Sequence, residues 1–293
     1  MSDFVQQQSV ECRFESSDSW VILSPIEQSI KRKIESVGTP LKDWDIQINY
    51  GIKTGFNDAF IINTEKRNEI LDNCSSEEER TKTAELIRPI LRGRDIKRYG
   101  YNWADLWLIA TFPSRHYNIE MYPAVKAHLL SFGKERLEQT GKKYIINGEE
   151  VKARKKTSNK WFETQDSISY WDDFLLPKLI YPETTQGAFF AYDETGLFLD
   201  KTCFMMISKH ARYLQATLSS QLFEFAYKRI FSSVELGQHG FQYNKHALIK
   251  LPVKKFNESD SVAYSDEFFY NCYGITNEEI EYIVGAIQSL QNQ

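Results

Sequence analysis

The alternation of strand-like and helix-like segments limits the possible folds of this chain more than any other feature of its sequence. Short runs with strand character occupy residues 46–52, 59–63, 106–111, 177–183, 188–200 and 203–208. Helical segments interrupt them at irregular spacing, and no glycine-rich phosphate fingerprint follows any of them. The pattern predicts an α+β fold, with a twisted mixed β-sheet and flanking helices, rather than repeated βαβ units.

Two helices carry signals at their ends. Ser24 and Glu27 have the spacing of a capping box, Pro25 occupies the first helical position, and Gly38 marks the end. A C-terminal amphipathic helix follows Thr276, with an apolar stripe that indicates a packed face. The stripe consists of Ile280, Ile283, Val284, Ile287 and Leu290. We also expect a helix from Ser75 to Pro89 and another at 211–230, with a break near Ser219–Ser220.

Composition indicates a globular, water-soluble chain. Of its 293 residues 42% are hydrophobic and 26% charged, and there is neither a membrane-length apolar run nor a secretory signal. The four cysteines are far apart, as free thiols in a reducing cytoplasm would be, and the five histidines lack metal-ligand spacing. We therefore expect a cytoplasmic protein without a metal site.

The net charge of −4 averages three unlike regions. Residues 1–87 contain 10 Lys/Arg against 16 Asp/Glu, residues 88–255 contain 26 against 17, and residues 256–293 contain none against 7. The positive middle region favours contact with a polyanion. The alternative is that these charges are scattered over a solvated surface.

The stretch "LIRPILRGRDIKRYGY" is the strongest candidate for such contact. Arg92, Arg94, Lys97 and Arg98 lie close together and are opposed by Asp95 alone. Arginine presents a planar fork of donors that suits phosphate oxygens or the guanine edge. The alternative is a solvated basic face in which Arg94 or Arg98 pairs with acidic neighbours.

The loop "GIKTGFN" places Lys53 and Thr54 between two glycines. The order of residues differs from that of an ATP- or GTP-binding loop, in which Lys and Ser/Thr follow the second glycine. Lys53 and Thr54 could instead hold a DNA backbone phosphate. The alternative is a structural turn in which Asn57 and Asp58 bond the nearby backbone.

Two further polar segments are candidates. Lys155 and Lys156 belong to residues 142–161, which contain seven Lys/Arg and an Asn147–Gly148 turn typical of an exposed hairpin or loop. Gln238 and Gln242 lie near two glycines, and glutamine can read adenine in the major groove. The alternatives are a lysine-rich loop and a polar loop, both without a ligand.

Catalytic motifs are scarce. There is no Gly-x-Ser-x-Gly elbow, no dinucleotide fingerprint and no Asn-Pro-Pro-Tyr-like motif. Glu150 and Lys152 match half of a nuclease metal site but lack a convincing acidic partner upstream. The sequence thus indicates a binding protein without catalytic or metal-binding residues of its own, with a metal-dependent nuclease that uses Glu150 and Lys152 as the alternative.

Five segments in a fixed order carry a family resemblance. They are "PLKDWDIQINYGIKTGFNDAFII", "ELIRPILRGRDIKRY", "WLIAT", "FLLPKLIYPE" and "ALIKLPV". Together they resemble the TaqI-like C-terminal specificity domain, the target-recognition part of type IIG restriction-modification enzymes and related N6-adenine methyltransferases. The resemblance spans roughly Trp20 to Val253.

The resemblance implies double-stranded DNA as a partner, together with a methyltransferase and endonuclease portion in cis or as a subunit. It implies no cofactor for this chain, since AdoMet and Mg²⁺ would serve only the absent catalytic parts. The expected organisation is an N-terminal linker and helix (1–39), a DNA target-recognition domain (40–255) and an acidic helical segment (256–293). A third possibility is a protein-interaction subunit whose acidic helix, Thr276 to Gln291, docks on a methyltransferase.

Overall fold

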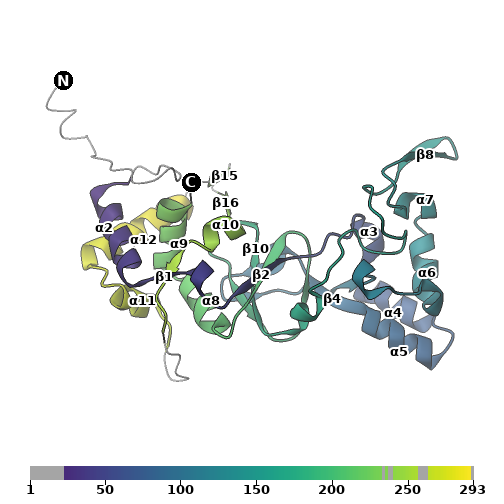
Figure 1. Cartoon of the computed structure of the whole chain (residues 1–293), viewed down its shortest axis with the longest axis horizontal. Coiled ribbons are helices and arrows are strands. Elements are labelled where there is room, and N and C mark those ends of the chain that lie inside the picture. The colour runs from purple at the N-terminus through teal and green to yellow at the C-terminus, as the bar shows by residue number, and fades with distance from the viewer. Residues whose placement is uncertain (1–22, 233–234, 237–239, 257–262, 292–293) are drawn as a thin grey trace.

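The computed structural model of the chain describes residues 23–232, 235–236, 240–256 and 263–291. The molecule is elongated, with helices gathered at both ends of a central β-structure (Figure 1). It has two hydrophobic cores, which we call the first core and the second core. The first contains the helices nearest both chain ends, and the second contains the helices and strands that follow Ile52. This architecture confirms the predicted α+β fold.

A fully antiparallel four-stranded sheet separates the two cores. Its strand order is β12 (Ala191–Asp193), β10 (Lys178–Pro182), β14 (Cys203–Ile207) and β2 (Gln47–Tyr50). Alternate residues of a strand point to opposite faces. Leu179 and Tyr181 accordingly enter the first core, and Ile180 enters the second. Burial on both faces explains why β10 and β14 read as continuous apolar runs.

The helices of the first core are α2 (Pro25–Val37), α8 (Ala211–Ser219), α9 (Gln221–Ala226), α10 (Lys245–Leu248), α11 (Asp266–Cys272) and α12 (Asn277–Gln291). A π-helical turn, Tyr227–Phe231, extends α9. Strand β1 (Thr39–Pro40) pairs with β17 (Pro252–Val253), and a 3-10 turn, Leu41–Asp43, follows β1. The capping box of Ser24 and Glu27 is formed, and Ser220 separates α8 from α9. The predicted helix start and the predicted break are both confirmed.

The second core is built on a mixed sheet, ordered β13 (Phe198–Leu199), β4 (Ile87–Leu91), β7 (Leu106–Ile109) and β3 (Ile61–Asn63), in which β13 and β4 are parallel. Its helices are α3 (Asn57–Phe60), α4 (Thr64–Asp72), α5 (Glu77–Leu86), α6 (Pro123–Leu130) and α7 (Lys134–Leu137). Short 3-10 turns occupy Gly93–Asp95, Pro113–Arg115, Ile119–Met121 and Trp171–Leu175. We call residues 123–164 the arm, which forms one extremity of the molecule (Figure 1).

Three smaller sheets complete the fold. They are the pair β5 (Ile96–Lys97) and β6 (Gly100–Tyr101), the hairpin β8 (Lys143–Ile146) and β9 (Glu149–Lys152), and the sheet β11 (Thr184–Thr185), β16 (Gly240–Gln242) and β15 (Glu235–Leu236). The β8–β9 hairpin protrudes from the arm. Asn147 and Gly148 form its turn with φ of 51° and 85°, which is the backbone that a two-residue Asn-Gly hairpin turn requires.

Two predicted element boundaries are wrong. The helix predicted to reach Pro89 ends at Leu86, and Ile87–Leu91 is strand β4 instead. Proline has no backbone N–H to donate to a neighbouring strand. Pro89 is tolerated in β4 because β13 pairs only with Ile90 and Leu91, so no hydrogen bond to β13 is lost at Pro89. The strand predicted over 59–63 begins only at Ile61, because a helical turn buries both Ala59 and Phe60, which a strand would point to opposite faces.

The apolar stripe of the C-terminal helix packs within the chain. Ile283 and Ile287 are buried in the first core, and Ile280 packs against it. The side chain of Leu290 lies outside the described residues. Interaction through this stripe with a separate partner, the possibility raised by its amphipathic pattern, is thereby disfavoured. The three-segment division of the chain stays a prediction.

Glu279 joins α12 to α2 and is 4% exposed. Its carboxylate accepts hydrogen bonds from Ser29 Oγ at 2.8 Å, Lys33 Nζ at 2.6 Å and the backbone N–H of Thr276 at 2.8 Å. Burial alone would raise its pKa, but these bonds lower it below the ordinary value of 4.5. The carboxylate therefore stabilises the fold fully above about pH 4.5, and this contribution is lost as pH falls through the lower folded pKa.

Glu279→Gln is expected to destabilise the chain by about 1 kcal/mol at pH 7, as loss of a helix cap does. Thermal unfolding of both proteins between pH 7 and pH 3 measures the effect. The advantage of the unaltered chain should shrink below about pH 4.5. An unchanged difference down to pH 3 would show that ionisation of Glu279 does not matter.

Among the helices of the described residues, none combines the length and apolar character needed to cross a lipid bilayer.

Candidate nucleic-acid interface

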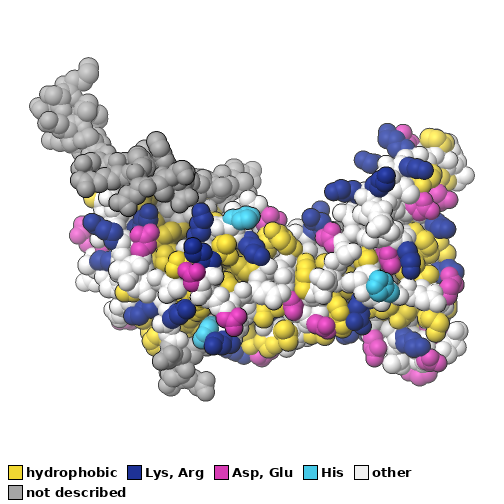
Figure 2. All heavy atoms as spheres, in the orientation of Figure 1, with side chains coloured by type: hydrophobic (Ala, Val, Ile, Leu, Met, Phe, Trp, Pro, Cys, Tyr) yellow, Lys and Arg dark blue, Asp and Glu magenta, His cyan; other side chains and the backbone are white. Residues whose placement is uncertain are grey.

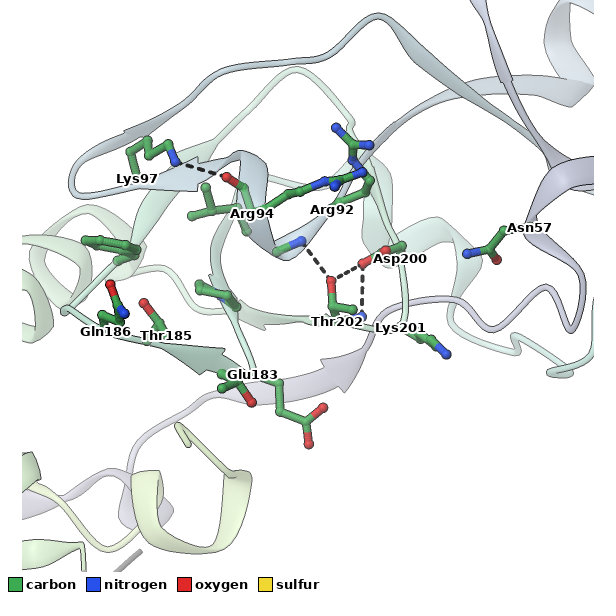
Figure 3. Close-up of a pocket in the computed structure, with 15 residues that line it drawn as sticks. Asn57, Arg92, Arg94, Lys97, Glu183, Thr185, Gln186, Asp200, Lys201 and Thr202 are labelled. Atoms are coloured by element: carbon green, nitrogen blue, oxygen red, sulfur yellow. Dashed lines mark hydrogen bonds between the residues drawn. The ribbon is translucent and has the colours of Figure 1, made fainter. Parts of the chain in front are cut away.

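A hollow of about 640 Å³ opens beside the turn that follows β4 (Figure 3). Its walls are formed by residues 92–97, 182–189 and 200–202, together with Asn57. The residues that line it are Asn57, Arg92, Gly93, Arg94, Ile96, Lys97, Pro182, Glu183, Thr184, Thr185, Gln186, Phe189, Asp200, Lys201 and Thr202. We call it the basic hollow, since four Arg/Lys side chains face two carboxylates there.

Three cations of the basic hollow are exposed: Arg94, Lys97 and Lys201. Lys97 Nζ donates to the backbone oxygen of Arg94 at 3.0 Å. Within the described part of the chain, the side chains of Arg94 and Lys201 make no hydrogen bond or ion pair. Their donors are thus available to an anionic ligand.

Arg92 also lines the hollow, but its guanidinium is occupied. Nε and Nη2 each donate at 2.9 Å to the carboxylate of Asp95, which is 7% exposed. These hydrogen bonds raise the pKa of Arg92, and they lower that of Asp95 although burial would raise it. The predicted contact of Arg92 with a phosphate or a guanine edge stays a prediction, and in this structure its Nε–Nη2 edge holds Asp95 and shapes the turn.

Arg98 has a structural role as well. Its Nε donates to the backbone oxygen of Ser219 at 2.8 Å, and Nη2 lies 3.6 Å from the Glu224 carboxylate. Arg98 does not line the hollow. The alternative in which Arg98 pairs with an acidic neighbour is therefore confirmed, and the predicted DNA contact by Arg98 is not supported by its position.

A buried lysine fixes the opposite wall of the hollow. Lys228 Nζ pairs with Glu224 at 2.7 Å and donates to the backbone oxygen of Gln186 at 2.7 Å. Gly93 N–H donates to Thr202 Oγ1 at 2.8 Å, and a Cβ at Gly93 would lie 2.9 Å from that oxygen. Gly93 thus allows close approach to the chain's own Thr202, which links two walls.

The loop with Lys53 borders the same region. Ile52 N–H donates to the backbone oxygen of Leu199 at 2.8 Å, and a Cβ on Gly51 would lie 1.8 Å from the Asp200 backbone oxygen. The loop therefore adjoins the Asp200–Thr202 wall. Lys53 is exposed and, among the described residues, its side chain makes no hydrogen bond or ion pair.

Thr54 does not fit its predicted phosphate contact. It is 1% exposed, its Oγ1 donates to Asn57 Oδ1 at 2.6 Å, and the same oxygen accepts from the N–H of Phe56 at 3.2 Å. A buried hydroxyl with two partners holds the turn together. The turn is structural, but its bonds differ from the predicted alternative: the Thr54 hydroxyl bonds the backbone, and Asn57 accepts from that hydroxyl.

Lys155 and Lys156 follow β9 on the arm and are exposed. They do not line the basic hollow. In Figure 2, Lys and Arg side chains gather on the side of the arm that faces the concave surface between the arm and the rest of the molecule. The structure thus presents two basic regions, the hollow and the arm.

The predicted adenine-reading residues have different outcomes. Gln238 lies outside the described residues. Gln242, on β16 opposite Thr184, donates from Nε2 to Glu183 Oε1 at 3.0 Å, so its amide is partly engaged. Gln186 instead lines the hollow, is exposed, and uses no side-chain atom in a hydrogen bond among the described residues.

Glu150 pairs with Lys143 at 2.8 Å on the exposed hairpin. Over the ranges that the structure describes, no three His, Cys, Asp or Glu side chains gather in a way that could hold a metal ion. Nothing in these ranges supports the nuclease alternative.

Comparison with known families decides the assignment. The model of the TaqI-like C-terminal specificity domain matches residues 88–253, more than half of the chain. The chain belongs to this family. The match confirms the family resemblance, and it begins after the first of the five sequence segments. It contains the arm and every lining residue of the basic hollow except Asn57.

Two solved structures resemble this specificity domain in fold. One is the type IIG restriction endonuclease BpuSI, with a TM-score of 0.52 and 13% identity, over 92% of this chain and 33% of that one. The other is the type IIL restriction-modification enzyme MmeI in complex with DNA, with a TM-score of 0.50 and 13% identity, over 87% of this chain and 37% of that one. The chain thus spans about a third of the length of either protein.

Sequence analysis did not single out Lys201 or Gln186, two exposed residues of the hollow. Neither belongs to a basic cluster, and Gln186 ends the short polar run "ETTQ". Gln186 comes shortly after β10 in the chain, and Lys201 comes shortly before β14. These two strands pair with each other, and the pairing brings both residues to the hollow. Only the strand order could have identified them.

Proposed function

We propose that this specificity domain recognises a specific sequence of double-stranded DNA for a restriction-modification enzyme. The AdoMet-dependent adenine methyltransferase and the Mg²⁺-dependent endonuclease belong to parts outside this chain, joined to it in cis or as a subunit, in the cytoplasm. The observation that carries the proposal is the basic hollow, with unpaired donors on a domain of the specificity family.

Each exposed group of the hollow has a role suited to its chemistry. Arg94 presents a free guanidinium for a guanine edge or a phosphate, and Gln186 presents a free amide for adenine. Lys97, Lys201 and Lys53 are point charges that suit backbone phosphates. Arg92 and Arg98 act through the protein, by shaping the turn and joining it to α8 and α9.

Selection of DNA from a randomised duplex library by the full chain at low salt tests the proposal. We expect enrichment of one short sequence, and binding of that duplex more tightly than of a scrambled one in fluorescence anisotropy. Equal affinity for both duplexes would contradict sequence-specific recognition.

Arg94→Ala is expected to weaken binding of the selected duplex by about fivefold to 150-fold, equivalent to about 1–3 kcal/mol. If Arg94 reads guanine, discrimination at one base pair should relax. If it contacts a phosphate, binding of the selected and scrambled duplexes should weaken alike.

Arg32→Ala is the matched control, because Arg32 is an exposed arginine on α2 outside the hollow. It should leave affinity nearly unchanged. Equal losses in the Arg94 and Arg32 variants would indicate a general charge effect and would remove Arg94 from the interface.

A further inference from the structure

The two faces of the β8–β9 hairpin differ in exposure. On the inner face, Tyr144 and Val151 are partly buried, and Tyr144 Oη donates to Glu138 Oε2 at 3.0 Å. On the outer face, Ile145 is 73% exposed, the highest exposure among the large hydrophobic residues that the structure exposes. An isoleucine in water on a protruding hairpin contributes nothing to either core, and it is not part of them.

Lysines flank Ile145 on the outer face. Lys143 and Lys152 are directly opposite each other across the two strands, a placement of like charges that is unfavourable in a sheet. Glu150 pairs with Lys143 at 2.8 Å, whereas Lys152 is exposed and makes no ion pair among the described residues. Glu150 is directly opposite Ile145 on this face. The face therefore combines an apolar centre with two lysines and one carboxylate that Lys143 engages, and the charge left over is positive, which complements a groove lined by phosphates.

The hairpin has the dimensions of a groove-binding ribbon. The major groove of B-DNA is about 12 Å wide and 8.5 Å deep and admits a two-stranded ribbon. Four residues per strand give the hairpin a length of about 13 Å, which is more than the depth of the groove. The base of the hairpin is held firmly. Ala153 N–H donates to the backbone oxygen of Lys142 at 2.9 Å, and Gly141 N–H donates to that of Arg154 at 2.8 Å.

We propose that this hairpin enters the major groove of the bound duplex and that Ile145 contacts the 5-methyl groups of thymine. The inference rests on the proposed function and adds a second reading element to it, separate from the basic hollow. Apolar side chains read thymine through its methyl group. Lys152, with Lys155 and Lys156 beyond it, holds the phosphates along the groove.

The test is a double-mutant cycle, in which residue 145 of the protein and the thymine bases of the duplex are changed singly and together, and the affinity of each combination is measured. Ile145→Thr and Ile145→Val form a matched pair, because both residues are β-branched and of similar shape, and threonine replaces one of the two methyl groups of valine with a hydroxyl. The duplex selected by the unaltered chain is compared with the same duplex in which deoxyuridine replaces every thymine.

On the thymine duplex, Ile145→Thr should bind about fourfold more weakly per contacted methyl group, and Ile145→Val should bind nearly as well as the unaltered chain. On the deoxyuridine duplex, all three proteins should bind alike. Because Ile145 is largely exposed, unfolding temperatures should not change and misfolding cannot produce the difference.

Lys152→Gln should lower the slope of log affinity against log salt by about 0.9. An equal loss for Ile145→Thr on both duplexes would overturn the thymine contact, and unchanged affinity of the Ile145 and Lys152 variants would overturn groove entry. Sequence-specific binding that survives all hairpin changes would leave the proposed function standing while rejecting this inference. Absence of duplex binding by the unaltered chain would reject both.

Discussion

Replacement of Arg154 by Met should lower the free energy of unfolding by about 3–5 kcal/mol. Arg154 is 5% exposed, and its guanidinium donates to backbone oxygens of four residues. They are Leu137 at 2.8 Å, Thr54 at 2.8 Å, Glu163 at 2.8 Å and Trp161 at 2.7 Å. Met fills similar space but donates nothing, so buried carbonyl groups lose their partners.

The loss should be concentrated in the arm, because these bonds fasten α7 and the segment after β9 to the loop at Thr54. Burial lowers the pKa of Arg154 to about 10, so the group stays charged at neutral pH. Hydrogen exchange should show faster opening of residues 137–164, and denaturant unfolding gives the free energy.

Lys155→Met is the neighbouring control, since Lys155 is exposed and should change stability by no more than about 0.5 kcal/mol. If the two variants were equally stable, the arm would not depend on the guanidinium. Loss of DNA affinity in the Arg154 variant without loss of stability would instead indicate a direct role in binding.

Lys178→Met is expected to cost about 3–5 kcal/mol, because it leaves a buried carboxylate without its cation. Lys178 and Asp193 are both 0% exposed, on β10 and β12 of the central sheet, with Nζ 2.5 Å from Oδ2. Lys178 Nζ also donates to the backbone oxygen of Phe174 at 2.5 Å. Burial lowers the pKa of Lys178, and the charge and hydrogen bond of Asp193 oppose that shift.

A double variant, Lys178→Met with Asp193→Asn, separates loss of the pair from loss of packing. Asn keeps one oxygen acceptor, for the N–H of Thr195 that donates to Oδ1, and carries no charge, but its amide nitrogen replaces the Oδ2 that accepts from the N–H of Leu197. Chemical denaturation should therefore find the double variant less destabilised than the sum of the two single changes.

The exposed pair Arg212–Glu194, at 63% and 58% exposure, provides the contrast. Arg212→Ala should cost about 0–1 kcal/mol, as surface ion pairs do. If the cost of Lys178→Met were equally small, water or a rearranged side chain would be compensating Asp193.

Local signals in the sequence were sufficient for elements whose ends are determined by neighbouring residues. The α2 start follows from Ser24 and Glu27, and the break between α8 and α9 follows from Ser220, whose side chain caps α9. The fully buried strands were recognisable as apolar runs. These features depend on contacts a few residues apart.

Features that depend on distant partners were missed or misassigned. The apolar spacing of Ile87–Leu91 is compatible with a helix or a strand. This segment forms a strand because it pairs with β7 and β13. The role of Arg98 depends on Ser219, and no local pattern reveals that Ser219 lies near Arg98. Sequence clustering pointed to the basic region but did not distinguish the arginines that hold the turn from Arg94, whose side chain has no hydrogen-bond partner among the described residues.

The division of labour in the basic hollow has an evolutionary consequence. Buried bonds from Lys228 and Gly93 hold its backbone, whereas Arg94, Gln186 and Lys201 only project from that frame into water. Substitutions at such exposed positions usually change stability by no more than about 0.5 kcal/mol. Under the proposed function, target preference can therefore drift by single replacements while the scaffold persists, and descendants with new cognate sites need not pass through unstable ancestors.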